Sequence, residues 1–372
     1  MYNKEYSGRE IDFRTFKLRD RKLAEQIIKS IKELGIEARF MHVCGTHQDT
    51  LVRFGLSELL KSCNIDVRQG PGCPVCVTTP KEIEEAILLA RKNITIATFG
   101  DMLNVPGEEQ SLQNLREKGY SVKMVYSIED AVEIASKNRD KDIVFMAIGF
   151  ETTAPSTASV LLNNPPENFS ILCCHRLIPP AVNTLLEMGE VRIDGMIEPG
   201  HVSTIIGVRS YEEISIKHKM PQVVAGFEPI DLLMATYMLA LQIKRGEAKV
   251  ENEYARLVRY EGNKIALEKI NEVFEPFDVS WRGFPVIPKS GLKLKENFSQ
   301  YDARKKYEDL LIELEGREFE EPPGCRCNEV LRGLITSQEC PLFGKVCTPS
   351  HPVGPCMVSR EGSCNIEFRY SK

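Results

Sequence analysis

The sequence predicts an α/β protein with two domains built on parallel sheets, followed by a C-terminal domain that is rich in cysteine and loops. Three observations support this fold class. Short apolar runs of strand type alternate with helical patterns through about the first 230 residues. The alternation fades beyond about residue 280, where Pro and Gly become frequent. Six of the twelve cysteines lie in residues 325–372.

The first domain is expected to span residues 1–119. A helical pattern at 21–35 precedes an apolar run at 38–43, and a second helical pattern at 81–92 precedes a run at 94–99. Short apolar runs bounded by turn residues are typical of strands that are buried on both faces, as in parallel sheets. The order of these patterns therefore predicts a parallel βα unit.

The second domain is expected to span residues 120–230 and to repeat the same alternation. Helical patterns at 127–138 and 181–189 separate strand-like runs. The runs occupy residues 122–126, 143–149, 169–175, 195–199 and 222–227. Their even spacing predicts a second parallel sheet with helices packed on it.

The third region, residues 231–372, is expected to hold a helical connector and then the cysteine-rich domain. Apolar residues cover most of the surface of the helix predicted at 229–246, so we expect this helix to be buried between domains. The segment that follows residue 280 has little periodicity, which is expected where a metal site rather than an apolar core holds the fold together.

Composition excludes several classes of function. With 42% hydrophobic residues, 372 residues are enough for two or three domain cores. The net charge of -5 argues against nucleic acid and against an anionic membrane surface as partners. The polar N-terminal segment and the lack of a long apolar run predict a cytoplasmic protein. In that reducing compartment, clustered cysteines indicate metal ligation or thiol chemistry rather than a disulfide scaffold.

The first candidate motif is CGTH, directly after the run at 38–43. Ligands bind at the carboxyl ends of the strands in open α/β sheets, so this loop is well placed. The Cys44 thiol would lie at a helix N-terminus beside His47, and both neighbours are expected to lower its pKa and favour a nucleophile or a soft-metal ligand. The alternative is a buried cysteine with Thr46 as a helix cap.

The second candidate motif is the CxxC pair Cys73 and Cys76, which is framed by Gly and Pro. Such a pair can act as a dithiol–disulfide switch or supply half of a four-cysteine metal site. The sequence contains no second CxxC to complete a zinc ribbon, which favours redox activity. A structural turn with incidental thiols is the alternative.

Other polar residues also follow predicted strands. Glu151, in GFETTAPS, could serve as an acid, a base or a ligand partner, although helix capping by the adjacent threonines is an equally good explanation of the motif. His201 follows a glycine that permits close approach of a ligand. Asp101, His175 and Glu228 occupy similar positions, and the group as a whole suggests a cleft.

The C-terminal segment contains six cysteines, and the first two form a C-x-C pair. Six thiols are two more than one iron-sulfur cluster needs. A [4Fe-4S] cluster takes four thiolates, which leaves two that can form a disulfide close enough to exchange electrons with it. Zinc is the alternative, but paired CxxC or CxxH knuckles are absent from this segment. The opening resembles the sulfur arrangement of ferredoxin:thioredoxin reductase, in which adjacent cysteines are divided between cluster and disulfide. The six are Cys325, Cys327, Cys340, Cys347, Cys356 and Cys364.

The complete set of motifs resembles the hydrogenase maturation factor HypD family, end to end and in its order. The motifs that carry the resemblance are CGTH at 44–47, GPGCPVC at 70–76, GFETTAP at 149–155, PGHVS at 199–203 and the six-cysteine tail. The resemblance implies a redox-active iron-sulfur scaffold that helps to assemble the Fe(CN)2CO unit of [NiFe]-hydrogenases. It also implies two partners, the small chaperone HypC and the cyanide donor HypE.

The resemblance also implies roles for single residues. Cys44 would bind the transient iron that carries cyanide and carbonyl ligands, with Thr46 and His47 orienting it. Cys73 and Cys76 would cycle between dithiol and disulfide near that iron. By analogy with the reductase, the cluster ligands would be Cys327, Cys340, Cys347 and Cys364, and the exchangeable pair Cys325 and Cys356. Exchanging the roles of Cys325 and Cys327 fits the spacing almost as well.

Two other classes of function remain open on the sequence alone. One is a disulfide reductase that passes electrons from the cluster to a protein substrate. The other is a structural zinc or iron-sulfur module that serves only interactions. No motif that we identify indicates that the chain forms the carbonyl ligand or hydrolyses a nucleotide.

Overall fold

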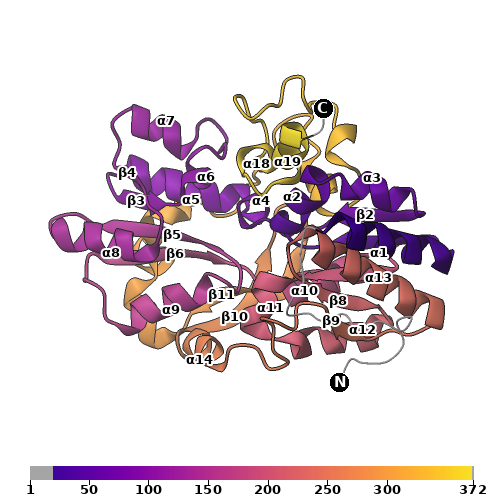
Figure 1. Ribbon diagram of the computed structural model, residues 1–372. Coiled ribbons are helices and arrows are strands. Elements are labelled where there is room, and N and C mark those ends of the chain that lie inside the picture. Colours follow the sequence, from indigo (N-terminus) through magenta and orange to yellow (C-terminus); the bar gives the residue numbers. More distant parts are fainter. Residues whose placement is uncertain (1–19, 371–372) are drawn as a thin grey trace.

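The computed structural model describes residues 20–370, so the polar N-terminal segment at 1–19 lies outside the described part. Two α/β units lie side by side, and the C-terminal segment lies across one end of both (Figure 1). Within residues 20–370, no helix has the length and apolar character needed to cross a membrane.

The first unit contains a parallel sheet with the strand order β2-β1-β7-β8-β9. Its strands are β1 (Ala38–His42), β2 (Ile65–Gln69), β7 (Gly195–Pro199), β8 (Gln222–Ala225) and β9 (Val250–Asn252). Its helices and turns are α1 (Arg21–Leu34), α2 (Gly45–Arg53), α3 (Leu56–Lys61), α11 (Gly200–Ile206), η1 (Val208–Tyr211), α12 (Glu212–His218) and α13 (Pro229–Arg245).

The second unit contains a parallel sheet with the strand order β4-β3-β5-β6. Its strands are β3 (Thr95–Thr98), β4 (Val122–Met124), β5 (Ile143–Gly149) and β6 (Phe169–His175). The helices of this part of the chain are α4 (Pro74–Val77), α5 (Pro80–Arg91), α6 (Gly100–Leu103), α7 (Leu112–Glu117), α8 (Ile128–Lys137), α9 (Ala154–Leu162), α10 (Ile178–Met188) and α14 (Lys264–Val273).

The sheets divide the chain differently from the predicted ranges 1–119 and 120–230. The chain leaves the first sheet after β2, builds the whole second sheet, and returns to the first sheet at β7, which pairs with β1. The apolar runs were identified correctly as parallel strands. Their pairing partners, however, depend on contacts between residues more than a hundred positions apart, which periodicity does not encode.

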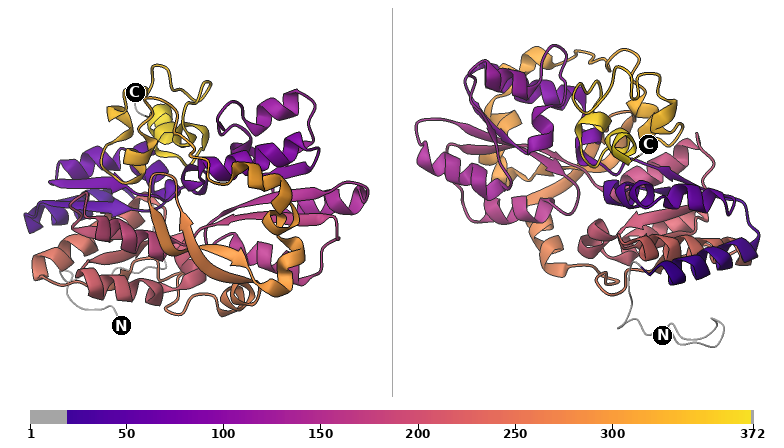
Figure 2. Two further views of the ribbon diagram at one scale, coloured as in Figure 1. Left: turned by 180° about the vertical axis from the view of Figure 1, so that it is seen from behind. Right: turned by 45° about the horizontal axis from the view of Figure 1, so that its top comes forward.

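An antiparallel hairpin follows β9 and α14 in the chain, with β10 (Phe274–Ser280) and β11 (Val286–Leu294). Figure 2 shows the hairpin crossing the back of the molecule between the two units. The C-terminal part then consists of short elements joined by loops. They are η2 (Glu296–Tyr301), α15 (Ala303–Lys306), α16 (Glu308–Leu311), η3 (Ile312–Leu314), α17 (Cys327–Leu331), η4 (Ser337–Glu339), α18 (Pro355–Val358) and α19 (Ser363–Tyr370).

Three apolar clusters hold these parts together. The largest joins one face of each sheet and includes Met41 of β1 and Met146 of β5, together with Cys73 and Cys76. The other two clusters cover the opposite faces of the second and first sheets. Helix α13 belongs to the cluster on the first sheet and packs against α1 and β8, so it is buried within one unit rather than between domains as expected.

Candidate metal and thiol site

Cys44 caps the N-terminus of α2, directly after β1. The GPG loop before the CxxC pair lies against it, and the backbone N–H of Gly45 donates to the carbonyl of Gly72 at 3.2 Å. A Cβ on Gly72 would stand 2.1 Å from the backbone nitrogen of Cys44, so only glycine permits this approach. The two predicted thiol motifs therefore meet at the carboxyl end of the first sheet.

The surroundings of Cys44 change its pKa in the direction opposite to the one expected. Burial raises the pKa of the Cys44 thiol to about 11, and the nearby Glu361 carboxylate adds to the increase. Hydrogen bonds from the backbone of His47 and from Thr46 lower the pKa but do not outweigh burial. The free thiol is therefore protonated at neutral pH, and a metal ion must displace its proton to bind.

His47 does not act as a cation beside the thiol. Burial lowers its pKa to about 3, so the imidazole is neutral. Its Nε2 lies 2.9 Å from the carbonyl oxygen of Gly226 and donates to it, which leaves Nδ1 without a partner in the described residues. The ring also contacts the ring of Phe227 at a centroid distance of 5.0 Å. His47 thus anchors the Cys44 loop to the segment after β8.

Phe227 connects His47 to the second predicted histidine. The ring of the exposed residue His201 stacks on Phe227, with the two ring centroids 3.8 Å apart. The structure therefore brings CGTH and PGHVS to the same edge of the first sheet. Phe227 was missed by sequence reasoning, because an aromatic residue at the end of an apolar run carries no separate signal.

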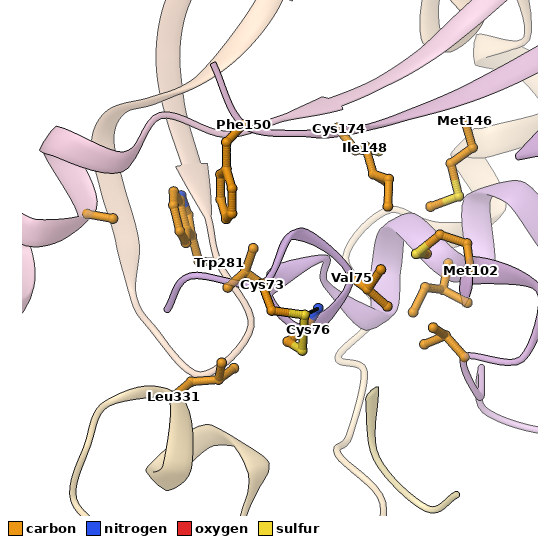
Figure 3. Close-up of a cluster of buried hydrophobic side chains, with 14 of the residues drawn as sticks. Cys73, Val75, Cys76, Met102, Met146, Ile148, Phe150, Cys174, Trp281 and Leu331 are labelled. Atoms are coloured by element: carbon orange, nitrogen blue, oxygen red, sulfur yellow. Dashed lines mark hydrogen bonds between the residues drawn. A yellow bond between two sulfur atoms is a disulfide. The ribbon is translucent and has the colours of Figure 1, made fainter. Parts of the chain in front are cut away.

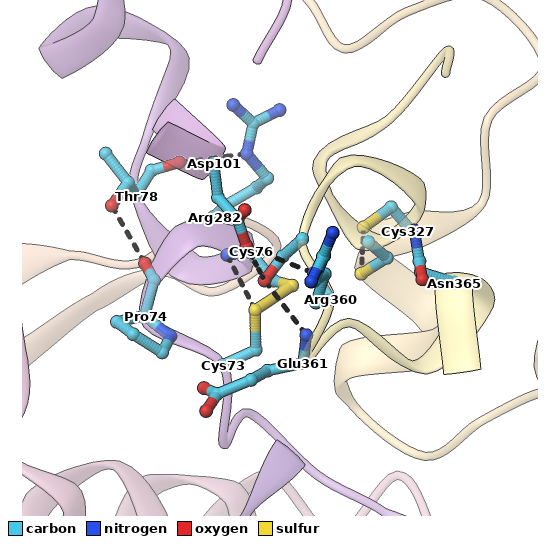
Figure 4. Close-up of a disulfide and its surroundings, with 12 residues drawn as sticks. Cys73, Pro74, Cys76, Thr78, Asp101, Arg282, Cys327, Arg360, Glu361 and Asn365 are labelled. Atoms are coloured by element: carbon cyan, nitrogen blue, oxygen red, sulfur yellow. Dashed lines mark hydrogen bonds between the residues drawn. A yellow bond between two sulfur atoms is a disulfide. The ribbon is translucent and has the colours of Figure 1, made fainter. Parts of the chain in front are cut away.

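Cys73 and Cys76 form a disulfide at the start of the short helix α4. Both residues are fully buried, and the backbone N–H of Cys76 donates to the Cys73 sulfur at 3.2 Å. Figure 4 shows the disulfide facing the C-terminal segment that carries Arg360 and Glu361. Helix α18, which contains Cys356, packs directly on α4.

Aromatic residues cover the side of the disulfide that is turned away from the C-terminal segment. Phe150 stacks on Trp281 with a centroid distance of 5.8 Å, and Figure 3 shows both rings beside Cys73. The indole nitrogen of Trp281 donates to the Ser290 hydroxyl at 2.9 Å, which fixes the ring. This apolar wall excludes water from the disulfide on one side.

Glu151 lies in the interior at the end of β5. One carboxyl oxygen accepts from the backbone N–H of Ile178 at 2.9 Å, and the other has no partner in the described residues. Burial raises the pKa of Glu151 to about 8. Thr153 occupies the N-cap position of α9, but its side chain makes no capping hydrogen bond. Its hydroxyl donates instead to the carbonyl of Phe150 at 3.1 Å, so the alternative explanation of the motif by helix capping is not confirmed.

A second interior carboxyl, Glu198, was not predicted. It lies on β7 one residue beyond Ile197, which pairs with His42, so its side chain points to the face occupied by Met196. Both of its oxygens lack partners within residues 20–370, and burial raises its pKa to about 8. Burial and then the charge of Glu198 raise the pKa of Tyr211. A charged residue inside an apolar strand was the signal that could have found it.

The six C-terminal cysteines line one cavity. The rest of its wall consists of Leu342, Phe343, Gly354 and Met357, and it contains no carboxylate or imidazole. A Cβ on Gly354 would stand 2.6 Å from the sulfur of Cys325, so the absence of a side chain leaves room for that thiol. A wall made only of thiols and apolar groups fits an iron-sulfur cluster, whose ligands are thiolates.

Within this cavity the sulfur atoms of Cys327 and Cys356 lie 2.6 Å apart. As placed, no three His, Cys, Asp or Glu side chains in residues 20–370 have the spacing of ligands to a single metal ion. A [4Fe-4S] cluster is larger than one ion, and the thiolates that bind it lie further apart than the ligands of a single ion. The lack of single-ion spacing in residues 20–370 is therefore compatible with a cluster in this cavity. The side chain of Cys356 also interacts with that of Cys364, so Cys356 has two close thiol neighbours. Its predicted pairing with Cys325 stays a prediction.

The C-terminal segment also reaches the Cys44 loop. The turn at 359–361 is held by Asp101, which accepts from the Ser359 hydroxyl and the Arg360 backbone N–H, both at 3.1 Å. Glu361 then lies over Gly45, where a Cβ would stand 2.6 Å from its backbone oxygen. Helix α19 packs on α2 as well. Thus the cysteine cavity, the disulfide and Cys44 lie on contiguous parts of one structure.

Two other strand-end residues have structural roles. His175 is buried and its Nε2 lies 3.0 Å from the Thr157 hydroxyl. Its edge faces Phe274 of the hairpin, away from the thiols. Glu228 caps the N-terminus of α13. Of the five strand-end residues, Asp101, Glu151 and His201 therefore belong to the region of the site, and these two do not.

Comparison with known proteins identifies the family. The HypD family model, described as the hydrogenase formation hypA family, matches residues 20–371. A putative hydrogenase expression/formation protein of Methanocaldococcus jannaschii is 49% identical over 363 residues, which cover 95% of this chain and 99% of that protein. The hydrogenase maturation factor HypD of Cupriavidus necator is 40% identical over 370 residues, which cover 95% and 96%. The chain therefore belongs to the HypD family of hydrogenase maturation factors.

Proposed function

We propose that this chain is the scaffold on which an iron ion receives cyanide and carbonyl ligands to make the Fe(CN)2CO unit of a [NiFe]-hydrogenase. The observation that carries the proposal is the contact between the two thiol motifs, in which Gly72 lies against Cys44. In this reading iron is the cargo, and Cys44 is its ligand. Thiolate is a suitable donor for low-spin iron that carries cyanide and carbonyl.

The neutral, buried surroundings of Cys44 support this role. Cys44 is 9% exposed as a whole residue, so little of it is in contact with solvent before a partner delivers iron. His47 and Thr46 fix the loop by hydrogen bonds, so the thiol is positioned before the metal arrives. The unpartnered oxygens of Glu151 and Glu198 can hold or release protons in the interior beside the site.

We propose a [4Fe-4S] cluster as the resident cofactor in the cavity of the six cysteines. A bound cluster would supply electrons one at a time. The proximity of Cys327 to Cys356 favours these two as the exchangeable pair, with Cys325, Cys340, Cys347 and Cys364 as ligands. This exchanges the roles of Cys325 and Cys327 relative to the first prediction. The packing of α18 on α4 then provides a short path from Cys356 to the Cys73–Cys76 disulfide.

A HypC-like chaperone and a HypE-like cyanide donor are the proposed partners. A HypC-like chain would share the iron with Cys44 through a thiol of its own, and a HypE-like chain would then transfer cyanide to that iron. His201 stacks on the Phe227 ring that contacts His47, and Glu361 lies over Gly45. Both residues are exposed near the Cys44 loop, so both are available to a docked partner.

A disulfide reductase acting on a protein substrate is less well supported. Cys73, Cys76 and Cys356 are buried, with 0%, 0% and 1% of their surface exposed. A protein disulfide must approach an attacking thiolate to within bonding distance, so access decides this chemistry. In the described structure these sulfurs can exchange only with partners already inside the protein.

Replacement of Cys44 tests the iron scaffold. We expect Cys44→Ala, purified anaerobically with a HypC-like partner, to lose the infrared bands of iron-bound cyanide and carbonyl. The variant should keep its melting temperature and its cluster absorption, because Cys44 does not line the cysteine cavity.

The matched control is Cys63→Ala. This buried thiol lies in the cluster that covers the outer face of the first sheet, so its removal should leave the infrared bands in place. Retention of the bands in Cys44→Ala would remove this residue from the mechanism.

Serine variants of the C-x-C pair test the cofactor and its ligands. The wild-type protein should contain about four irons and four acid-labile sulfides per chain, because a [4Fe-4S] cluster has that stoichiometry. Cys325→Ser should lose most of the cluster, whereas Cys327→Ser should keep it and lose only the exchangeable disulfide. Stoichiometric zinc without sulfide would favour the structural module instead, and cluster loss only in Cys327→Ser would restore the first assignment.

A further inference from the structure

A cleft of about 910 Å³ lies beside the cysteine cavity. One wall is the loop between α6 and α7, residues 104–111. The other wall comes from two C-terminal segments, 318–323 and 349–353. Figures 1 and 2 show α7 and the C-terminal loops on either side of this region. None of the predicted site residues lines the cleft, so it is distinct from the iron site.

The charge of the cleft is strongly negative. Its lining contains five glutamates and one arginine. Glu108, Glu109 and Glu321 each pair with an arginine, but Glu318 and Glu320 are exposed and have no ion-pair partner in the described residues. A cleft lined by one sign of charge focuses its field and attracts cationic ligands.

A buried arginine that lines the cleft is a second indication of a ligand, independent of the negative charge. The Arg282 side chain is 2% exposed, and its Nη1 donates to Glu321 at 2.6 Å. Its Nη2 has no hydrogen-bond partner within residues 20–370. A buried N–H without an acceptor is costly, so a ligand that supplies a carbonyl oxygen is favoured here. Main-chain carbonyls of an extended peptide are acceptors of this kind.

The same segments also border both thiol sites. The backbone N–H of Cys325 donates to Pro322 at 3.0 Å, and that of Val353 donates to the Cys347 sulfur at 3.3 Å. Arg282 donates through its backbone to Val77 at 2.9 Å and through Nε to Thr78 at 2.9 Å, at the end of the helix that holds the disulfide. A ligand in the cleft is therefore separated from each thiol site by a single layer of chain.

The lining favours a protein segment over a small molecule. Sites for small molecules and cofactors are mostly apolar and aromatic. This cleft contains no aromatic residue, and six prolines stiffen its walls. Rigid walls, free negative charge and an unused side-chain donor on Arg282 together fit an extended segment that carries lysine or arginine.

We propose that this cleft is the docking site for a basic, extended segment of a one-electron carrier protein. In each encounter the carrier is oxidised by one electron and the cluster is reduced by one electron, with no bond made or broken. Two encounters supply the two electrons that, with two protons, reduce one disulfide to a dithiol. The docking site rests on the cleft alone, whereas the electron transfer rests on the cluster of the proposed function.

Binding of a fluorescent octalysine peptide tests the docking site without the cluster. We expect fluorescence anisotropy to show binding at low ionic strength that weakens as salt is added. The double variant Glu318→Lys/Glu320→Lys should weaken binding about tenfold or more, because each substitution turns an attraction into a repulsion.

The matched control is Glu129→Lys/Glu213→Lys, which makes the same change of net charge on α8 and α12, away from the cleft. Both glutamates are exposed, so both double variants should fold. The control should change the affinity by less than about threefold, since exposed charges far apart are screened. Equal losses in the two variants, or no binding to the wild type, would overturn the docking site.

A second measurement tests the redox role. The same electron path is followed in its reverse direction, in which reduced holoprotein is mixed with ferricytochrome c, a lysine-rich redox protein, and haem reduction is measured by stopped flow. The cleft variant should slow the second-order transfer about tenfold, and the control should not. An unchanged transfer rate in a variant that no longer binds the peptide would overturn the redox role and leave the iron scaffold untouched.

Discussion

Glu198 is the least satisfied charged residue of the interior. Neither carboxyl oxygen has a hydrogen-bond partner in the described residues, and the side chain is fully buried on β7. An ionised carboxylate at this position would lose its hydration without gaining a hydrogen bond in return. Burial therefore raises the pKa of Glu198 to about 8. Groups of this kind collect where protons are handled, and Tyr211 lies within reach of its field.

The raised pKa predicts a pH-dependent stability for Glu198→Gln. The folded state keeps the Glu198 proton up to about pH 8, whereas in the unfolded chain the group loses it near 4.5, the ordinary pKa of a glutamate. The contribution of Glu198 to the free energy of unfolding of the wild type is therefore complete below pH 4.5 and is lost as the pH rises towards 8. Since one pKa unit corresponds to about 1.4 kcal/mol, Glu198→Gln should be more stable than the wild type by at least about 1 kcal/mol near pH 9.

Calorimetric melting temperatures across the pH range measure this effect. The difference between Glu198→Gln and the wild type should grow between about pH 5 and pH 8 and then level off. Glu129→Gln, at an exposed position on α8, should show no such trend. A difference that is constant with pH would mean that Glu198 is ionised in the folded protein.

Helix α5 shows how one element is fixed by residues from three others. Its N-terminus has a capping box between Thr79 and Glu82, and the same Glu82 carboxylate takes two hydrogen bonds from Arg176, at 2.8 and 2.7 Å. Burial alone would raise the pKa of Glu82, but the charges of Arg176 and Arg304 outweigh it and lower the pKa. Arg176 also donates to the carbonyl of Ser280 on the hairpin at 3.1 Å. The helix, the second sheet and the hairpin thus share one buried ion pair.

Breaking that pair should destabilise the protein strongly. Glu82→Gln leaves Arg176 charged and without its anion in the interior, and removal of one partner of a buried pair typically costs about 3–5 kcal/mol. Chemical denaturation measures the loss. The control Glu133→Gln removes the partner of Lys137 in an exposed pair and should cost less than about 1 kcal/mol. Similar losses in both variants would show that the buried pair adds no stability of its own.

At the scale of the whole molecule, the C-terminal segment connects the two α/β units. It contacts Asp101 beyond the second sheet through Ser359, and the Cys44 loop of the first sheet through Glu361. Its own elements are short helices and turns, and buried residues such as Leu331 and Met357 join it to the largest apolar cluster. The proposed iron-sulfur cluster, bound by four of its cysteines, would stabilise the segment further.

Loss of the cluster should therefore loosen this segment before the sheets. After oxidative removal of iron and sulfide, we expect trypsin to cleave first at Arg326, Lys345 or Arg360, while the fragment that contains both sheets stays intact. Mass spectrometry of the first products locates the cuts. Initial cleavage within α8 or α12 instead would show that the cysteine domain is held by packing alone.

Much of the fold could be predicted because it depends on local pattern. The apolar runs at 143–149 and 169–175 coincide with β5 and β6, whose residues are all buried. The hairpin was missed, since β10 and β11 are mixed in polarity and β10 contains Pro276. The expected net shift of the Cys44 pKa was wrong in sign, because burial raises that pKa by more than His47 and Thr46 lower it. Burial is a property of the assembled chain and not of a motif.

The sequence by itself determined the family, the parallel strands and the thiol motifs, because these depend on residue type and short spacing. Only the tertiary structure decided that β7 returns to pair with β1, and that Cys327 rather than Cys325 lies beside Cys356. It also brought Glu361 over Gly45. Such contacts join residues far apart in the chain, and they are fixed by the packing of complete elements and not by the local preferences of any segment.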